Sequence, residues 1–253
     1  MSFKENDFVE IEYTAYDAES NDILSTTSEE KAKNENIYDE HNHYGPTLVV
    51  LGSHAIVPGL EKEITNMEVG ESKTFTLDPK DAFGERDENL VGVMPISQFK
   101  ENNIDPKPGM QINLDNSIAT IKSVGSGRVV VDRNHPDAGK KIKYEIKVVK
   151  QLKENKEKIE GLAETYEVKP SKLEIEDGKV KLYYNPEFKK SADYFVGKAN
   201  ALAAIFTYLP EIKDINVIEE YENINTKKAE TSNQEKSNWL DFSNLFYLIA
   251  NPI

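Results

Sequence analysis

The sequence predicts an α+β fold: a curved, barrel-like antiparallel sheet with a short helix, a small inserted β-rich domain, and a separate C-terminal α+β domain. Two strongly patterned strands that lie far apart in the chain predict the sheet. Between them, over residues 88–131, prolines and turn residues become frequent, which predicts the insertion. The order of elements after residue 152 predicts the last domain. A length of 253 residues exceeds one average domain, which agrees with two or three domains.

The two strands of the predicted sheet alternate apolar and polar residues. Apolar residues at Val9, Ile11, Tyr13 and Ala15 are separated by Glu10, Glu12 and Thr14. The same period of two recurs from Ile142 to Val148. A sheet whose first and last strands flank an insertion explains why these segments are so far apart.

Between these strands the sequence predicts a loop, a helix and a further strand. Residues 28–43 are rich in Glu, Lys and Asn, and we expect a surface excursion there. Pro58 opens a short helix whose Leu60, Ile64 and Met67 share one face. Gly70 then permits the left-handed residue that releases the chain into a strand over residues 73–77.

The predicted insert contains several prolines and two expected hairpin turns. Pro95, Pro106 and Pro108 interrupt residues 88–131, and hairpin turns are expected at Asp115-Asn116 and at Gly125-Ser126-Gly127.

The predicted C-terminal domain has the order helix, hairpin, helix, strand. Ile159, Leu162 and Tyr166 recur at helical spacing, and a hairpin turns at Asp177-Gly178. A longer helix from about Pro186 to Tyr208 and a strand over 212–218 follow. We expect the chain to divide into residues 1–86 plus 132–152, the insert 87–131, the C-terminal domain 153–222, and a polar tether with an aromatic tail, 223–253.

Composition excludes several classes of function. The 31 basic and 45 acidic residues give a formal net charge of −14, which repels phosphate backbones and argues against nucleic-acid binding. The chain has no cysteine, so disulfides and thiolate chemistry are excluded. The beginning lacks the apolar core of a signal peptide and no apolar run approaches a membrane span, so we expect a cytoplasmic protein without membrane contact.

Histidines do not form a recognisable catalytic or metal motif, and we expect neither a metal nor a cofactor. His41 and His43 lie in a polar loop, where surface positions are commoner than metal ligands. His135 in Asn134-His135-Pro136 is interpreted as a turn residue.

Four motifs carry a resemblance to a known family. Val57-Pro58-Gly59-Leu60-Glu61 and Asp81-Ala82-Phe83-Gly84 are similar to FKBP-type prolyl isomerases. The runs 84–91 and 131–140 resemble the two edges of the insert-in-flap domain in the SlyD-like and archaeal long-form branch. The resemblance extends over residues 1–152.

The resemblance implies a proline-binding pocket and names its residues. The catalytic set would be Tyr13, Ile56, Val57, Leu60, Phe83 and Tyr144. The substrate-binding set would add Leu24, Ser25 and Val49 in the pocket, and Val91, Val93, Met94, Ile96 and Phe99 in the insert. Core packing is the alternative for each of them, since such side chains on strands usually fill a core. Ser25 departs from many relatives, which have Asp at that position.

The implied activity is isomerisation of X–Pro bonds in unfolded or nascent proteins, with chaperone activity from the insert. A non-catalytic chaperone or dimeric scaffold with a degenerate pocket is the alternative. Long archaeal relatives dimerise through the C-terminal domain, so we also expect a homodimer. The tail is expected to pack on a partner subunit or in an apolar groove, because Trp239, Phe242 and Phe246 are costly to leave in water.

Overall fold

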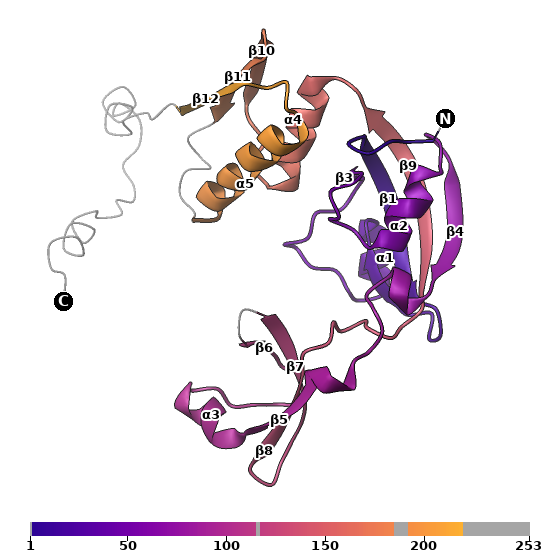
Figure 1. Ribbon diagram of the computed structural model, residues 1–253, viewed down its shortest axis with the longest axis vertical. Helices are drawn as coiled ribbons and strands as arrows, with labels where there is room; N and C mark the ends of the chain where they lie inside the picture. Colours follow the sequence, from indigo (N-terminus) through magenta and orange to yellow (C-terminus); the bar gives the residue numbers. More distant parts are fainter. Residues whose placement is uncertain (1, 115–116, 185–191, 220–253) are drawn as a thin grey trace, which may run out of the picture.

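The computed structural model describes residues 2–114, 117–184 and 192–219, and within these ranges the strands form three separate sheets (Figure 1). The first sheet has the order β2-β1-β9-β4, with β3 paired to β1. Its strands are β1 (Phe8–Asp17), β2 (Ile23–Thr26), β3 (Thr47–Val50), β4 (Ser72–Leu77) and β9 (Ile142–Leu152). All of its pairings are antiparallel, as expected.

The two strands that the sequence pattern predicted are central in this sheet. β1 pairs with β9 along its whole length, and Ala15 lies opposite Tyr144. Val9, Ile11 and Ala15 point into the core, whereas Glu10 and Glu12 between them do not. The first and last strands of the sheet were predicted to flank an insertion in one sheet, and the pairing of β1 with β9 confirms this.

Helix α2 (Pro58–Thr65) packs against the core face of this sheet. Pro58 occupies the first turn, where its missing N–H costs nothing. Leu60 and Ile64 are buried together with Met67, as their spacing predicted. Gly59 lies so close to the segment after β4 that an added Cβ would be 2.7 Å from the Asp81 carbonyl oxygen and 2.7 Å from a Leu77 methyl group.

This close approach makes Gly59 a sensitive position for stability. We expect Gly59→Ala to lower the free energy of unfolding by roughly 1–3 kcal/mol, because the new methyl group meets backbone that cannot move aside. Gly92→Ala is the matched control, since an added Cβ there has no heavy atom within 4 Å. Urea unfolding of both variants measures the difference, and equal midpoints would contradict the close contact.

Residues 28–43 contain a short helix that was not expected from their polar composition. Helix α1 (Glu29–Asn34) begins because the Ser28 hydroxyl accepts a hydrogen bond from the Lys31 N–H at 3.3 Å. Ala32 is buried and anchors it. The excursion is thus a capped helix followed by a loop.

The insert has its own sheet and core. It comprises β5 (Val91–Pro95), α3 (Ile96–Glu101), β6 (Gln111–Leu114), β7 (Ser117–Gly125) and β8 (Arg128–Asp132), in the sheet order β5-β8-β7-β6. Phe99, Ala119, Ile121, Val129 and Val131 form the buried core. The turn at Gly125-Ser126-Gly127 is confirmed, whereas Asp115-Asn116 lies outside the described residues.

The C-terminal elements follow the predicted order. They are α4 (Asn155–Thr165), β10 (Lys172–Glu176), β11 (Lys179–Tyr184), α5 (Ala192–Tyr208) and β12 (Asp214–Glu219). The hairpin at Asp177-Gly178 is confirmed, and both residues have positive φ. β12 pairs with β11 in parallel, which pattern alone does not reveal. The first residues of the predicted long helix, 186–191, and the tail lie outside the described residues.

The C-terminal elements share a core with the first sheet. Phe8, Val50 and Leu152 belong to the same buried cluster as Ile159 and Ile205. The rings of Phe8 and Tyr208 meet edge to face, with centroids 6.5 Å apart. The first sheet and the C-terminal elements are therefore packed together. In the described ranges, none of the helices is both long and apolar enough to cross a bilayer.

Candidate functional site

Four segments of the first domain bring the predicted catalytic residues together. β1 supplies Tyr13, β9 supplies Tyr144, and the start of α2 supplies Leu60 with Ile56 and Val57 just before it. Phe83 follows the short 3₁₀ turn Pro79–Asp81 after β4. All six side chains belong to one apolar cluster or pack against it.

The floor of this cluster is buried. Leu60, Val49 and Tyr144 are almost fully covered. The Tyr144 ring stacks on Phe75 at 5.8 Å and lies 6.2 Å from the Tyr13 ring. Burial raises the pKa of Tyr144 to about 12, with smaller contributions from Tyr13 and Asp137. The phenol therefore stays neutral, and Val49 and Leu60 support the floor from within the core.

The rim of the cluster is half-buried. Tyr13, Leu24, Ile56, Val57 and Phe83 pack on the core while part of each side chain remains accessible. Half-buried apolar side chains above a buried aromatic floor form a surface that removes water from an apolar group placed on it.

Ser25, where many relatives have Asp, faces the Tyr13 hydroxyl. The two side-chain oxygens are 3.1 Å apart and share a hydrogen bond. A cavity of about 250 Å³ beside them is lined by Tyr13, Leu24 and Ser25 and by the loop residues Ile37 and Tyr44. The Tyr13 N–H donates to the Thr27 hydroxyl at 2.9 Å, which fixes the strand at this point.

His135 is a neighbour of the site that sequence reasoning missed. Its ring stacks on Phe83, with centroids 4.3 Å apart and planes 2° apart. The predicted turn role is also present, because the Asp137 N–H donates to His135 Nδ1 at 3.1 Å. The chain order could have indicated this contact. Both links to the insert start from the same end of the sheet, and this brings residues 83 and 135 together.

The two links to the insert are tied to each other by buried polar groups. Asp132 is only 2% exposed, and Arg86 donates to its carboxylate at 2.5 Å. Asn134 donates to Asp132 through its backbone N–H at 3.0 Å and its side-chain amide at 2.8 Å. The same amide group exchanges two hydrogen bonds of 2.9 Å with the backbone of Asp87. Residues 86–87 and 132–134 therefore form one connected polar network.

The charge state of Asp132 follows from this network. Burial acts to raise the pKa of Asp132, but the hydrogen bonds from Asn134 and the ion pair with Arg86 outweigh it and hold that pKa at about 2. Lys122 adds a second cation at 3.6 Å. The carboxylate is ionised over the physiological pH range.

The five predicted insert residues have different environments. Val93 is 61% exposed, Val91, Met94 and Ile96 are half-buried, and Phe99 lies in the buried core of the insert. The sequence left two roles open for these residues, core packing and binding of substrate. Phe99 packs in the core, and Val93 faces solvent.

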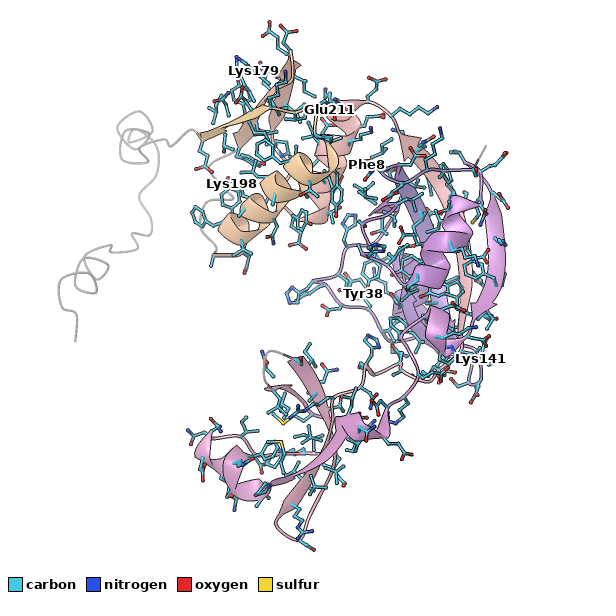
Figure 2. The ribbon with its side chains drawn as sticks, in the orientation of Figure 1. Phe8, Tyr38, Lys141, Lys179, Lys198 and Glu211 are labelled. Carbon is cyan, nitrogen blue, oxygen red and sulfur yellow. The ribbon has the colours of Figure 1, made fainter. Side chains whose placement is uncertain are left out.

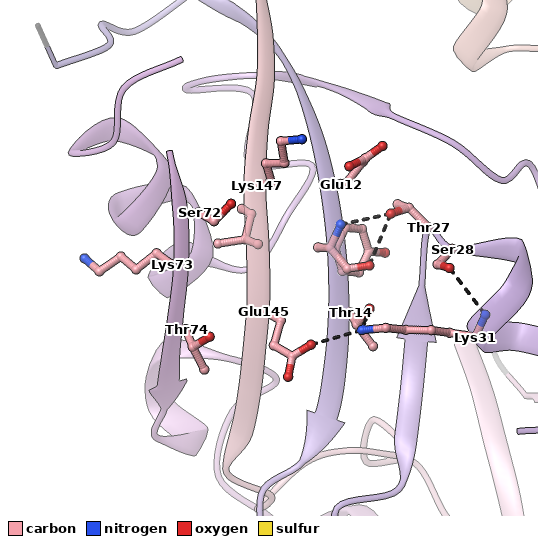
Figure 3. A pocket seen from close by; sticks show the side chains of 12 residues that line it. Glu12, Thr14, Thr27, Ser28, Lys31, Ser72, Lys73, Thr74, Glu145 and Lys147 are labelled. Atoms are coloured by element: carbon pink, nitrogen blue, oxygen red, sulfur yellow. Dashed lines mark hydrogen bonds and ion pairs between the residues drawn. The ribbon is translucent and has the colours of Figure 1, made fainter. Parts of the chain in front are cut away.

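A larger cavity of about 520 Å³ also contacts Tyr13, and Figure 3 shows its polar lining. Lys31 on α1 donates to Glu145 on β9 at 3.0 Å. Thr14 on β1, which lies next to β9, is 3.2 Å from the same ammonium group. Tyr13 is the one predicted site residue among its lining residues. The described residues hold no group of three or more His, Asp or Glu side chains that could bind a metal.

Comparison with known proteins identifies the fold that carries this cluster. The profile of the FKBP-type peptidyl-prolyl cis-trans isomerase family matches residues 1–100, and that of the FKBP26 IF domain matches residues 92–137. A short-type peptidyl-prolyl cis-trans isomerase of Methanocaldococcus jannaschii is 34% identical over 145 residues, which cover 57% of this chain and 91% of the relative. The isomerase SlyD of Helicobacter pylori is 31% identical over 144 residues, covering 55% of this chain and 69% of the relative.

These relatives and the α+β architecture agree with the resemblance carried by the motifs. The chain therefore belongs to the FKBP-type peptidyl-prolyl cis-trans isomerase family and is an isomerase that binds proline-containing polypeptides.

Proposed function

We propose that the half-buried cluster between β1, β9 and α2 binds the X–Pro bond of unfolded or nascent proteins in the cytoplasm. Ile56, Val57 and Phe83 hold the proline ring at the rim, and Tyr144 and Leu60 support it from the buried floor, so that water is removed from its imide bond. Leu24, Ser25 and Val49 complete the pocket, with Val49 acting from within the core. The observation that carries the proposal is the accessible apolar rim above a buried aromatic floor.

Such a pocket needs no general acid or base. Rotation about an X–Pro bond is slow because twisting it sacrifices amide resonance, at a barrier of about 18–20 kcal/mol. The twisted imide is less dipolar than the planar one, so a dry apolar site favours the twisted form over the planar form. Because proline has no N–H, the substrate carbonyl oxygens need donors, and we assign the Tyr13 hydroxyl and the Ile56 backbone N–H to them.

Ser25 fits a supporting role in this scheme. The Tyr13 hydroxyl is both donor and acceptor, and its contact with Ser25 holds the phenol without adding a charge. The pocket then acts mainly through its apolar walls. Isomerisation of a short X–Pro peptide by the wild type and by pocket variants tests the scheme, and catalysis that survives loss of the Phe83 and Tyr13 side chains would favour a degenerate pocket.

We further propose a division of labour between residues 1–86 plus 132–152, the insert 87–131 and the C-terminal domain 153–222, with 223–253 as tether and tail. The insert captures unfolded chains on its exposed apolar surface. Val93 supports this role because it is 61% exposed in a domain that has its own buried core.

Val93→Asp is expected to weaken suppression of aggregation of an unfolded client protein several-fold, because a charge on the capture surface opposes binding of apolar segments. Isomerisation of a short X–Pro peptide should be unchanged, since such a peptide does not need the insert. Val69→Asp, at an exposed valine of the first domain, is the matched control. Equal loss of aggregation suppression in both variants would argue against the insert as the capture surface.

We also propose that the C-terminal domain mediates a homodimer. The resemblance to long archaeal relatives supports it, as does the presence of a packed α+β unit beyond residues 1–137, which the two family profiles match. Light scattering of the full chain is expected to give the mass of two chains, and a version ending at Leu152 that of one. Single-chain masses for both would reject the dimer.

A further inference from the structure

Helix α5 has an apolar face that no described part of the chain covers. Phe195, Val196 and Phe206 are 50%, 60% and 47% exposed. The opposite face of the helix contributes Tyr194, Ala201, Ala204 and Ile205 to the shared core. The exposed side chains are therefore not needed for the fold of their own domain, and large exposed apolar side chains gathered on one helix face mark a binding surface.

The exposed residues form a regular stripe along the helix. Ala192, Val196, Ala199, Ala203 and Phe206 follow at steps of three or four residues, and all are exposed. The small Ala199 and Ala203 lie between the larger Val196 and Phe206. Such a face accepts bulky apolar side chains, as when an amphipathic segment binds in a groove.

The one cation of this helix, Lys198, is paired beside the stripe. Lys198 Nζ lies 2.5 Å from a Glu219 carboxylate oxygen, and the Tyr194 hydroxyl donates to the same oxygen at 2.7 Å. Figure 2 shows Lys198 on α5. The stripe itself is apolar and uncharged, so its partner is an apolar segment with little charge.

The same contacts fix the place from which the rest of the chain departs. Glu219 is the last described residue, and it is bonded to α5 at Tyr194 and Lys198, next to Phe195 and Val196. A chain of 19 residues, the number in 220–238, can reach at most about 63–68 Å. The stripe from Ala192 to Phe206 is about 21 Å long, so the segment that follows can reach all of it.

That segment has the matching chemistry. Residues 239–253 carry a single charge, on Asp241, in a chain of which 30% of the residues are charged. Its large apolar residues are Trp239, Leu240, Phe242, Leu245, Phe246, Tyr247, Leu248, Ile249 and Ile253. Tethering keeps this segment near α5 at an effective concentration on the order of millimolar, so even a weak contact is well populated.

We infer that residues 239–247 bind the apolar face of α5 in the same chain. The interaction covers Phe195, Val196 and Phe206 and at the same time removes the aromatic tail from water. It is independent of the isomerase site, which lies on the first sheet and α2.

Trp239 provides a direct test because it is the one tryptophan in the sequence. Its fluorescence in the full chain is expected at shorter wavelength than that of a water-exposed indole. Val196→Asp and Phe206→Asp should each shift the emission to that of exposed indole, whereas the control Val69→Asp should leave it unchanged. Far-ultraviolet circular dichroism checks that the variants are folded, and the milder Phe206→Ala should give a smaller shift in the same direction.

Emission of exposed indole in the wild type would overturn the inference, and so would a shifted emission that both α5 variants leave intact. Dilution distinguishes a tail that binds its own chain from a tail that binds a second copy. An emission that is constant with concentration supports binding within one chain. An emission that moves to longer wavelength as the mass falls from two chains to one would instead place the tail on a second copy and reject the intramolecular contact. Peptide isomerisation, measured on the same samples, reports failure of the isomerase site separately.

Discussion

Phe83→Ala is expected to lower kcat/KM for isomerisation of a short X–Pro peptide by about 10- to 100-fold, equivalent to about 1.4–2.7 kcal/mol of transition-state stabilisation. The ring is part of the accessible rim and is held in place by stacking on His135. Its loss opens the pocket to water, which stabilises the planar imide more than the twisted one. A protease-coupled assay of the wild type and the variant measures the change.

Two further variants make this result specific. Tyr13→Phe keeps the aromatic wall and removes only the hydroxyl that contacts Ser25, so a smaller loss is expected. Ile175→Ala removes an exposed apolar side chain in the C-terminal hairpin and should leave kcat/KM unchanged. Unaltered kcat/KM in Phe83→Ala, with thermal stability also unchanged, would remove Phe83 from the site.

Asp132→Ala is expected to cause the largest loss of stability, about 2–3 kcal/mol in the free energy of unfolding. The substitution leaves Arg86 without the carboxylate that it contacts at 2.5 Å and leaves two buried N–H donors of Asn134 without the oxygen that accepts from both. Asp105→Ala is the matched control in the same insert, because its pair with Lys107 is exposed and 3.6 Å long. Urea unfolding measures both, and equal losses would contradict a special role for the buried network.

The depressed pKa of Asp132 also predicts a pH dependence. An aspartate with a folded-state pKa of about 2 and an ordinary value of 3.8 is bound more favourably as the anion in the folded protein. The resulting stability, about 2 kcal/mol, is fully present above the ordinary value and is lost as the pH falls through about 4 to 2. Asp132→Asn should remove this part of the acid sensitivity, so its stability curve should be flatter than that of the wild type below pH 4.

The periodicity of apolar residues in the sequence predicted which faces of the main strands and of α2 are buried. The alternation around Ile11 and Ile146 fixes which faces of β1 and β9 are buried, and the spacing of Leu60 and Ile64 fixes the buried face of α2. The family resemblance named Phe83 and Tyr13 as pocket residues, and both side chains pack on the same apolar cluster. Their catalytic roles remain proposals.

Specific side-chain contacts between distant segments, and one strand pairing, were not predicted, although the pairing of β1 with β9 was. The stacking of His135 on Phe83 and the bonds between Arg86 and Asp132 arise only when the two links to the insert meet. The parallel pairing of β12 depends on which edge of the hairpin the chain returns to after α5. Helix α1 was missed because its composition is polar and its one buried side chain, Ala32, gives no periodic signal.

Strand β9 has a consequence for how the molecule moves. It runs without a break from Tyr144, under the proposed proline site, to Leu152, which packs with the C-terminal elements, a path of about 26 Å. β9 is paired with β1 along this path, with one register shift between Glu10 and Ile11, so we expect the two regions to move largely together. The insert is joined to this sheet through two links that meet where Arg86 contacts Asp132, so we expect relative motion of the insert to act on the chain there, three residues from Phe83.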